Sequence, residues 1–219
     1  MHIRFLTGET PLTCQDGAWR ENAEVTLLGF CDEVVSYERE LKGETNFFES
    51  AARLSKNANS VVVCGCITDT KGLKRKSAVV AEKGRLVGVS DMFNGVDGKY
   101  GSGAQLRVYE TSIGRMGVVV AEDIQFPEIF QSLSLCGSDF IVCTFGEMEG
   151  IEKVLLRAHA YCYGVPIYFC AKGYCMIVDV TGDIAYATPE NATVTNFFPR
   201  KEYHLVETRR RGFSKARLQ

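Results

Sequence analysis

The chain has 219 residues, of which 46% are hydrophobic and 24% are charged, and its formal net charge is -2. These are ordinary values for a globular protein, and the length fits one domain with a sizeable core better than two. The near-neutral charge excludes a general electrostatic attraction to nucleic acid or anionic lipid. No apolar stretch approaches the length that spans a bilayer, so we expect no membrane association.

Nine cysteines are scattered along the chain, most of them inside apolar runs. Their number is odd, and residues 1–6 are too short and too charged a start for a secretory signal, which predicts reduced thiols and a cytoplasmic location. Cys64 and Cys66 form a Cys-x-Cys pair, but no second pair stands at zinc-site spacing. On a strand both thiols would point to one face. We interpret them as small buried apolar residues and expect no metal and no other cofactor.

The first third of the chain alternates short apolar runs with polar segments. Residues 47–56 carry apolar side chains at helical spacing, which predicts an amphipathic helix. The last two predicted strands of this part flank a glycine turn and therefore form a hairpin. The predicted strands are residues 3–6, 25–30, 60–67, 76–81 and 85–89.

The remainder alternates predicted strands with predicted helices over residues 127–135 and 151–163. Residues 94–103 hold four glycines and are predicted to be a loop. The alternation predicts an α/β layered domain over residues 1–207, followed by a basic tail over residues 208–219. We interpret the tail as solvated or packed on a partner, and expect no nucleic acid because a larger basic face is lacking. The predicted strands are residues 106–110, 118–121, 140–144, 165–171, 176–180 and 184–187.

The segment 118–128 is the most informative one for function. A buried strand ends at Ala121, three acids (Glu122, Asp123 and Glu128) follow, and a helix begins among them. In open α/β sheets ligands bind beyond the carboxyl ends of strands, and a helix N-terminus there offers free N–H groups. We therefore predict a site at this turn. The alternative is that Asp123 and Glu128 only cap and brace the turn.

The same segment resembles the nucleophile region of the carbon–nitrogen hydrolase, or nitrilase, superfamily. Residues 114–128 read G-R-M-G-V-V-V-A-E-D-I-Q-F-P-E, where the family has G-R-x-G, an apolar strand ending in Cys, and then x-D-x-x-F-P-E. Similar segments stand in family order at 76–88, at 157–160 and at 173–182, where Cys175 takes a serine position. The resemblance covers about residues 24–187.

The resemblance implies a four-layer αββα sandwich, which usually forms dimers through its helical faces. It also implies a reaction in which a Cys attacks a nitrile or amide carbon, a Glu acts as general base and a Lys stabilises the tetrahedral intermediate. The first outer helix is expected to be shortened or missing, because the segment between the first two strands is short and holds Pro11 and Gly17. Its loss would uncover a patch for a partner or a second subunit.

The family's catalytic positions are occupied by other residues in this chain. The nucleophile position holds Ala121, and the lysine position, counted from the hairpin, falls at Met92. Lys99, further along the glycine-rich loop, is a weak substitute. The general-base position falls at Asp32 or Glu33, and the register between them stays open. Because nucleophile, base and lysine act as a unit, the chain is predicted to be inactive by the Cys-Glu-Lys route.

Three functions follow as hypotheses. The first is a protein that binds a small amide or carboxylate ligand in the vestigial pocket, or serves as an assembly subunit, as a homodimer or higher oligomer. The second is a divergent amide or nitrile hydrolase that uses another nucleophile such as Cys143, which with Glu122 and Glu128 is expected to border the pocket. The third is a pure protein-interaction module. His159 and His204 have no evident partner and are interpreted as surface or packing residues.

Overall fold

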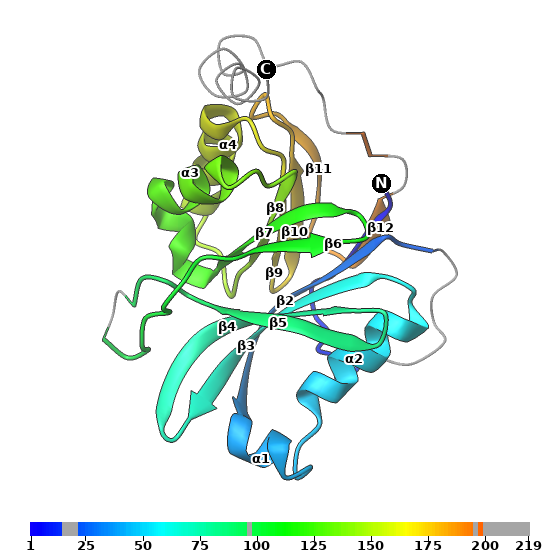
Figure 1. The fold of residues 1–219 in the computed structure, drawn as a ribbon. Coiled ribbons are helices and arrows are strands. Elements are labelled where there is room, and N and C mark those ends of the chain that lie inside the picture. The colour runs from blue at the N-terminus through cyan, green and yellow to red at the C-terminus, as the bar shows by residue number, and fades with distance from the viewer. Residues whose placement is uncertain (15–21, 96–97, 195–196, 199–219) are drawn as a thin grey trace, which may run out of the picture.

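The computed structural model describes residues 1–14, 22–95, 98–194 and 197–198. In this part of the chain, two six-stranded sheets stack face to face and the helices cover their outer faces (Figure 1). The predicted domain boundary at residue 207, the tail 208–219 and His204 lie outside the described residues.

The first sheet has a parallel centre and antiparallel edges, with the strand order β12-β1-β2-β3-β4-β5. Its strands are β1 (Ile3–Leu6), β2 (Val25–Ser36), β3 (Val61–Thr70), β4 (Leu73–Glu82), β5 (Arg85–Asp91) and β12 (Ala192–Val194). Strands β1, β2 and β3 run parallel, and the other pairs are antiparallel. β2 is longer than predicted and contains two register shifts, around Phe30 and before Val34.

The second sheet has the same plan, with the order β11-β10-β9-β8-β7-β6. Its strands are β6 (Val108–Thr111), β7 (Gly114–Val120), β8 (Phe140–Thr144), β9 (Ile167–Ala171), β10 (Tyr174–Val178) and β11 (Ile184–Thr188). β7, β8 and β9 run parallel. Every residue of β8 and β9 is buried, which explains why the sequences of these two strands are continuous apolar runs.

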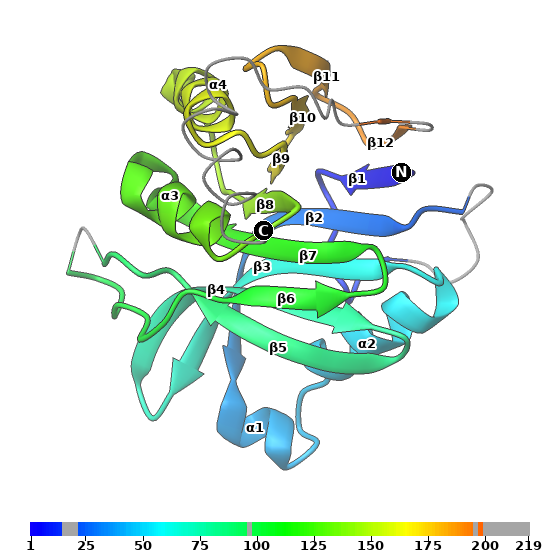
Figure 2. The same cartoon turned by 45° about the horizontal axis from the view of Figure 1, so that its top comes forward.

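Two groups of helices lie on opposite sides of the sandwich, as the turned view shows (Figure 2). The first group follows β2, and the second group covers the second sheet. The helices are α1 (Tyr37–Leu41), α2 (Phe47–Asn57), the short 3-10 turn η1 (Ala121–Gln125), α3 (Pro127–Leu135) and α4 (Ile151–Tyr163). α1 and β12 were not predicted. Within the described residues, every helix is too short or too polar to cross a bilayer.

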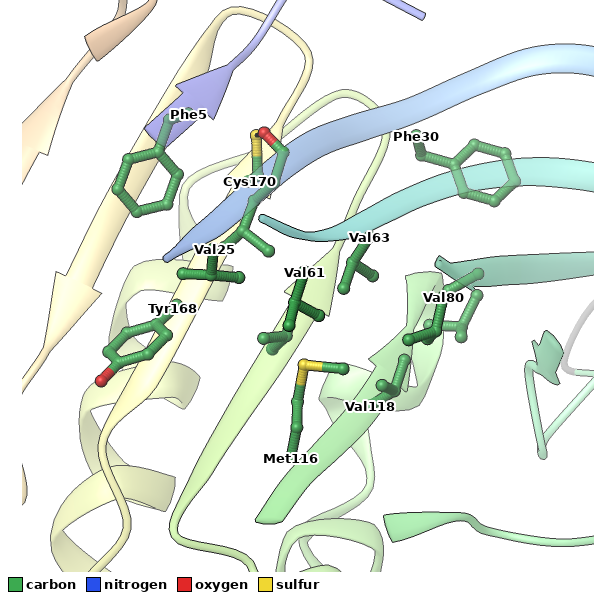
Figure 3. Close-up of a cluster of buried hydrophobic side chains, with 14 of the residues drawn as sticks. Phe5, Val25, Phe30, Val61, Val63, Val80, Met116, Val118, Tyr168 and Cys170 are labelled. Atoms are coloured by element: carbon green, nitrogen blue, oxygen red, sulfur yellow. Dashed lines mark hydrogen bonds between the residues drawn. The ribbon is translucent and has the colours of Figure 1, made fainter. Parts of the chain in front are cut away.

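The central core lies between the two sheets (Figure 3). Val61, Val63 and Val80 of the first sheet meet Met116 and Val118 of the second, and all five are buried. Alternate residues of each strand point to this interface, because side chains along a strand alternate between its two faces.

Two outer cores complete the four layers. Phe47, Ala51 and Leu54 of α2 pack on the outer face of the first sheet, together with Cys64 and Cys66. The two thiols lie on one face, as predicted, and burial raises the pKa of each well above its ordinary value. On the other side, α3 and α4 pack on the second sheet. The predicted αββα sandwich is thereby confirmed.

The segment between β1 and β2 differs from a full outer helix in its described part. Residues 7–14 form turns, in which the N–H groups of Thr13 and Cys14 donate to the carbonyl of Thr10 at 3.1 Å. Arg4 and Leu6, whose side chains alternate with the inward-facing Ile3 and Phe5 of β1, are nevertheless 4% exposed. At these two residues the expected uncovered patch does not occur.

Candidate functional site

Ala121 occupies a strained backbone position at the carboxyl end of β7. Its φ is +48°, in the left-handed region that residues with a Cβ seldom adopt, and it begins the turn η1 that separates β7 from α3. Such conformations cost about 1–3 kcal/mol and persist only where the surrounding structure maintains them, which is often the case at functional sites. The turn therefore keeps a sharp strand-to-helix geometry although its first residue carries only a methyl group.

A cavity of about 290 Å³ lies against this methyl group, and we call it the Ala121 cavity. It draws residues from both sheets and lies beyond the carboxyl ends of β7 and β8, where α/β sheets bind ligands. Its volume is about ten times the share of one water molecule in the liquid, so it suits a small molecule. It is lined by Phe30, Asp32, Lys76, Lys99, Tyr100, Ala121, Glu122, Phe145, Gly146 and Glu147.

The two sheets approach each other closely beside the Ala121 cavity. The N–H of Phe30 in β2 donates to the carbonyl oxygen of Phe145, just after β8, at 3.0 Å. Gly29 permits this approach, because a Cβ there would lie 2.9 Å from the carbonyl carbon of Ala171. The contact holds two aromatic residues of the cavity, one from each sheet, in fixed positions.

Asp123 fixes the loop that follows β5. Its two carboxylate oxygens accept the N–H groups of Phe93, at 2.6 Å, and Asn94, at 2.9 Å, and Asn94 Nδ2 also donates at 3.2 Å. Burial raises the pKa of Asp123, while these hydrogen bonds act in the opposite direction. Asp123 therefore braces the turn and its neighbouring loop, as the structural alternative for this residue predicted.

The Ala121 cavity is lined by both lysines and carboxylates. Lys76 forms an ion pair with Glu122 Oε1, and its ammonium also lies 5.1 Å from the centre of the Tyr100 ring. The ammonium of Lys99 lies 5.3 Å from the same ring. The second carboxylate oxygen of Glu122 is buried and accepts no hydrogen bond from the described residues. The cavity thus presents both donors and acceptors to a polar ligand.

Asp32 and Glu33 lie on different sides of β2. Both residues are exposed, but Asp32, two residues after Phe30, lines the Ala121 cavity and Glu33 does not. The register of β2 against β3 shifts between Phe30 and Val34, so the sequence alternation alone does not decide which of the two residues reaches the cavity. Of the two residues left open by the sequence, Asp32 is the one that the structure brings to Ala121.

Met92 lies in the central core, 1% exposed, and is not among the residues that line the cavity. Lys76, on the neighbouring strand, does line it. The sequence analysis missed Lys76, although a signal was available: Ala78 and Val80 of the same strand face the central core, and residue 76 continues their alternation. Tyr100 and Glu147 were also missed, because loop residues follow no periodicity.

Two expected pocket residues lie elsewhere. Glu128 is exposed in the first turn of α3 and does not line the cavity. Cys143 is 2% exposed and belongs to the core between the second sheet and its helices, on the face opposite to the cavity. Burial raises the pKa of its thiol well above the ordinary value, which opposes a reactive thiolate. The expectation that Glu128 and Cys143 border the pocket was therefore wrong.

His159 is a packing residue, as predicted. It is 6% exposed, its Nε2 lies 3.0 Å from the carbonyl oxygen of Ile124, and its ring stacks on Phe130 with 4.2 Å between centres. Burial lowers the pKa of His159, and the hydrogen bond to Ile124 opposes that shift. Among the described residues, His, Cys, Asp and Glu side chains do not gather in a group that could hold a metal ion.

Comparison with known proteins places this geometry among carbon–nitrogen hydrolases. Residues 16–196 match the sequence model of the carbon-nitrogen hydrolase family. A deaminated glutathione amidase of Yersinia enterocolitica is 31% identical in an alignment of 106 positions that covers 42% of this chain. That match spans 37% of the relative's length, well under two thirds of it.

Solved structures with the same fold are more distant in sequence. The Nit3 protein of Saccharomyces cerevisiae, a member of the nitrilase superfamily, superposes with a TM-score of 0.73 at 11% identity, covering 97% of this chain and 93% of its own. A carbon-nitrogen hydrolase of Helicobacter pylori G27 gives 0.66 at 17% identity, covering 90% and 83%. An alanine variant of an amidase from Nesterenkonia sp. AN1, in complex with butyramide, gives 0.71 at 14% identity, covering 100% and 96%.

Proposed function

Because this chain belongs to the carbon-nitrogen hydrolase family, we propose that it binds a small amide or carboxylate in the Ala121 cavity without the family's covalent chemistry. The observation that carries the proposal is the position of Ala121. A strained strand-to-helix turn presents this residue to a cavity with charged walls, yet a methyl group cannot attack a carbonyl or nitrile carbon.

The lysines that line the cavity, Lys76 and Lys99, also come from other positions than the one the resemblance assigns. The resemblance places the family's lysine at Met92, which is buried in the central core, whereas Lys76 brings an ammonium to the cavity and pairs it with Glu122. A lysine held by a carboxylate is suited to donate a hydrogen bond to a neutral carbonyl oxygen. Without a nucleophile, this donor contributes to binding rather than to turnover.

A relative supports binding without a cysteine. The Nesterenkonia amidase is described with its cysteine replaced by alanine and with butyramide bound, and another variant of it carries a covalent adduct on the active-site cysteine. In that protein, an alanine variant of the same fold therefore holds an amide. We extend this behaviour to the present chain. Its own sequence has alanine, Ala121, at the position where the resemblance places the family's cysteine.

The walls of the cavity match the groups of a primary amide. Asp32 is an acceptor for its N–H groups, and Lys76 is a donor for its carbonyl oxygen. Phe30 and Phe145 offer apolar surface to a short alkyl chain. A carboxylate would use the same lysine but would meet repulsion from Asp32 and Glu122, so we expect the amide to bind more tightly.

Filling the cavity tests the proposal. Gly146 lines the cavity, and a Cβ at this position would have nothing within 4 Å, so Gly146→Leu is expected to fold and to occupy ligand space. Gly8→Leu is the matched control, because Gly8 is equally open and does not line the cavity. Calorimetric titration with butyramide should give binding to the wild type and to Gly8→Leu, and none to Gly146→Leu. Equal binding by all three proteins would refute the proposed site.

We also propose that the chain forms a homodimer through the outer face of α4. Ile151, Val154 and Tyr161 are 52%, 61% and 46% exposed and follow helical spacing, so they form an apolar stripe that points to solvent. A second copy would bury the stripe against itself in a two-fold arrangement. Light scattering should report a dimer that Val154→Asp converts to monomer, whereas Val34→Asp, at an exposed valine of β2, should leave the dimer intact.

A further inference from the structure

Four cysteines lie in the outer core that α2 forms with the first sheet. They are Cys14, Cys31, Cys64 and Cys66. Cys64 and Cys66 are 0% exposed, whereas Cys14 and Cys31 are partly exposed. Two thiols that meet in a fold can be joined by oxidation, and the pair that an oxidant joins must combine close approach with access from solvent.

The pairing of β2 with β3 brings Cys31 beside Cys66. Phe30 pairs with Gly65 in this parallel ladder, and the residues that follow them are Cys31 and Cys66. Before the next registered pair, β2 has three residues, 31–33, where β3 has only Cys66. Neighbouring strands lie about 4.8 Å apart, and a disulfide requires Cα atoms about 4.4–6.8 Å apart. The spacing of the two strands therefore suits a disulfide between these cysteines.

The thiol of Cys31 lies against the peptide group that precedes Cys66. Its Sγ donates to the carbonyl oxygen of Gly65 at 3.1 Å. In a standard trans peptide this oxygen is about 2.8 Å from the next Cα, so the Sγ of Cys31 lies within about 6 Å of the Cα of Cys66. The Cα of Cys64 is further from that oxygen, because the whole of Gly65 separates them. Of the two buried cysteines, Cys66 is therefore the partner within reach.

The two thiols differ in access, which gives their oxidation an order. Cys31 is partly exposed and meets a peroxide first: its sulfur takes up one oxygen as a sulfenic acid, and one water leaves. The thiol of Cys66 then attacks that sulfur, the S–S bond forms, and the hydroxyl leaves with the proton of Cys66 as a second water. The two sulfurs together lose two electrons, which reduce the two oxygens of the peroxide.

From this arrangement we propose that Cys31 and Cys66 are an oxidation site, which a peroxide joins as a disulfide and a thiol reductant reopens. Residues 31–33 have no registered partner in β3, so the small backbone adjustment that the bond requires can take place there. Phe30 and Asp32, on either side of Cys31, line the Ala121 cavity, so the crosslink acts on the wall of that cavity. Burial raises the pKa of Cys31, which makes the first step slow at neutral pH and suits a response to sustained oxidant.

Peptide mapping of the oxidised chain tests the inference. The folded protein is treated with hydrogen peroxide, the remaining thiols are blocked, and tryptic peptides are analysed by mass spectrometry without reduction. Peptide 21–39 contains Cys31, and peptide 57–71 contains Cys64 and Cys66. We expect these two peptides to appear linked, with two hydrogens fewer than their sum, and dithiothreitol to abolish the linked species. Fragmentation of the linked wild-type peptide between Cys64 and Cys66 should place the bond on Cys66 without any variant.

Cys64→Ala and Cys66→Ala are a matched pair of variants, because both cysteines are 0% exposed and lie in the same outer core. Cys64→Ala should keep the linked species, whereas Cys66→Ala and Cys31→Ala should lose it. A bond from Cys31 to any cysteine other than Cys66 would overturn the inference. So would the absence of a link once the exposed Cys136 and Cys162 of the same sample are oxidised. The crosslink is measured without an amide, so its outcome is independent of the proposed function.

Discussion

The backbone N–H of Met92 donates a hydrogen bond to the carbonyl oxygen of Lys76, with 2.7 Å between nitrogen and oxygen. The two residues are therefore direct neighbours across β4 and the end of β5. Their side chains nevertheless have different environments: that of Met92 lies in the central core, and that of Lys76 lines the Ala121 cavity. The cavity retains a cation although the position aligned with the family's lysine does not carry one.

Removing that cation should weaken amide binding. Lys76→Met deletes the donor for the ligand carbonyl, so the dissociation constant for butyramide should rise about tenfold, the usual loss for a hydrogen bond to a charged group. Lys74→Met, on an exposed position of the same strand, is the matched control and should bind as the wild type does. Unchanged binding by Lys76→Met would show that Lys76 does not contact the ligand.

Relief of backbone strain at Ala121 should stabilise the fold. Glycine adopts φ near +48° without the Cβ penalty, so Ala121→Gly should raise the free energy of unfolding by up to about 1 kcal/mol. Ala187→Gly, at an exposed strand position, should lower it by roughly 0.5–1 kcal/mol. Urea titration of both variants measures the two signs. A destabilised Ala121→Gly would mean that the methyl contacts outweigh the strain.

Thiol labelling tests the hypothesis of another nucleophile. Cys143 is buried and its pKa is raised, so iodoacetamide should modify it far more slowly than the exposed Cys136 and Cys162, as read by peptide mass spectrometry. In Ala121→Cys, the introduced thiol should react faster than Cys143, because it faces the cavity beside Lys76. Rapid labelling of Cys143 in the folded wild type would instead revive the hydrolase that uses this residue.

Acid should destabilise the fold through His159. Its pKa in the folded state is lowered from the ordinary 6.5, so the unfolded chain takes up the proton more readily, and this contribution to stability is lost as the pH falls below about 6.5. His159→Phe keeps a ring against Phe130 and removes the titration. Urea unfolding between about pH 5 and pH 7 should therefore show a smaller loss on acidification in the variant than in the wild type. Equal losses would assign the acid sensitivity to other groups.

Much of the architecture was predictable because its signals are periodic or local. Helices α3 and α4 and strand β8 have the predicted bounds, since an apolar repeat and a proline or glycine mark their ends. The sequence analysis missed α1 and β12. β12 is only three residues long, and its pairing with β1 joins residues that lie far apart in the sequence. The cytoplasmic location and the boundary at residue 207 stay predictions.

The site was only partly predictable, for a geometric reason. Ala121 and Glu122 follow from the motif, which left Asp32 and Glu33 open as alternatives. Whether a strand residue lines the cavity depends on the face of the strand to which its side chain points. Cys143 is the second-last residue of β8, the strand beside β7, and yet it points to the helices, since adjacent residues of a strand alternate in direction. No local pattern marked Tyr100, which reaches the site from a loop.

One experiment tests the central claim, that the Ala121 cavity binds an amide and leaves it intact. Butyramide is incubated with the wild-type chain and followed by proton NMR, in which saturation transfer from the protein reports contact and new signals of butyrate report hydrolysis. The account predicts saturation transfer that Gly146→Leu abolishes, with no butyrate above the protein-free control. Butyrate that accumulates in proportion to the wild-type protein, and not with Gly146→Leu, would contradict it and show that the cavity still performs the reaction.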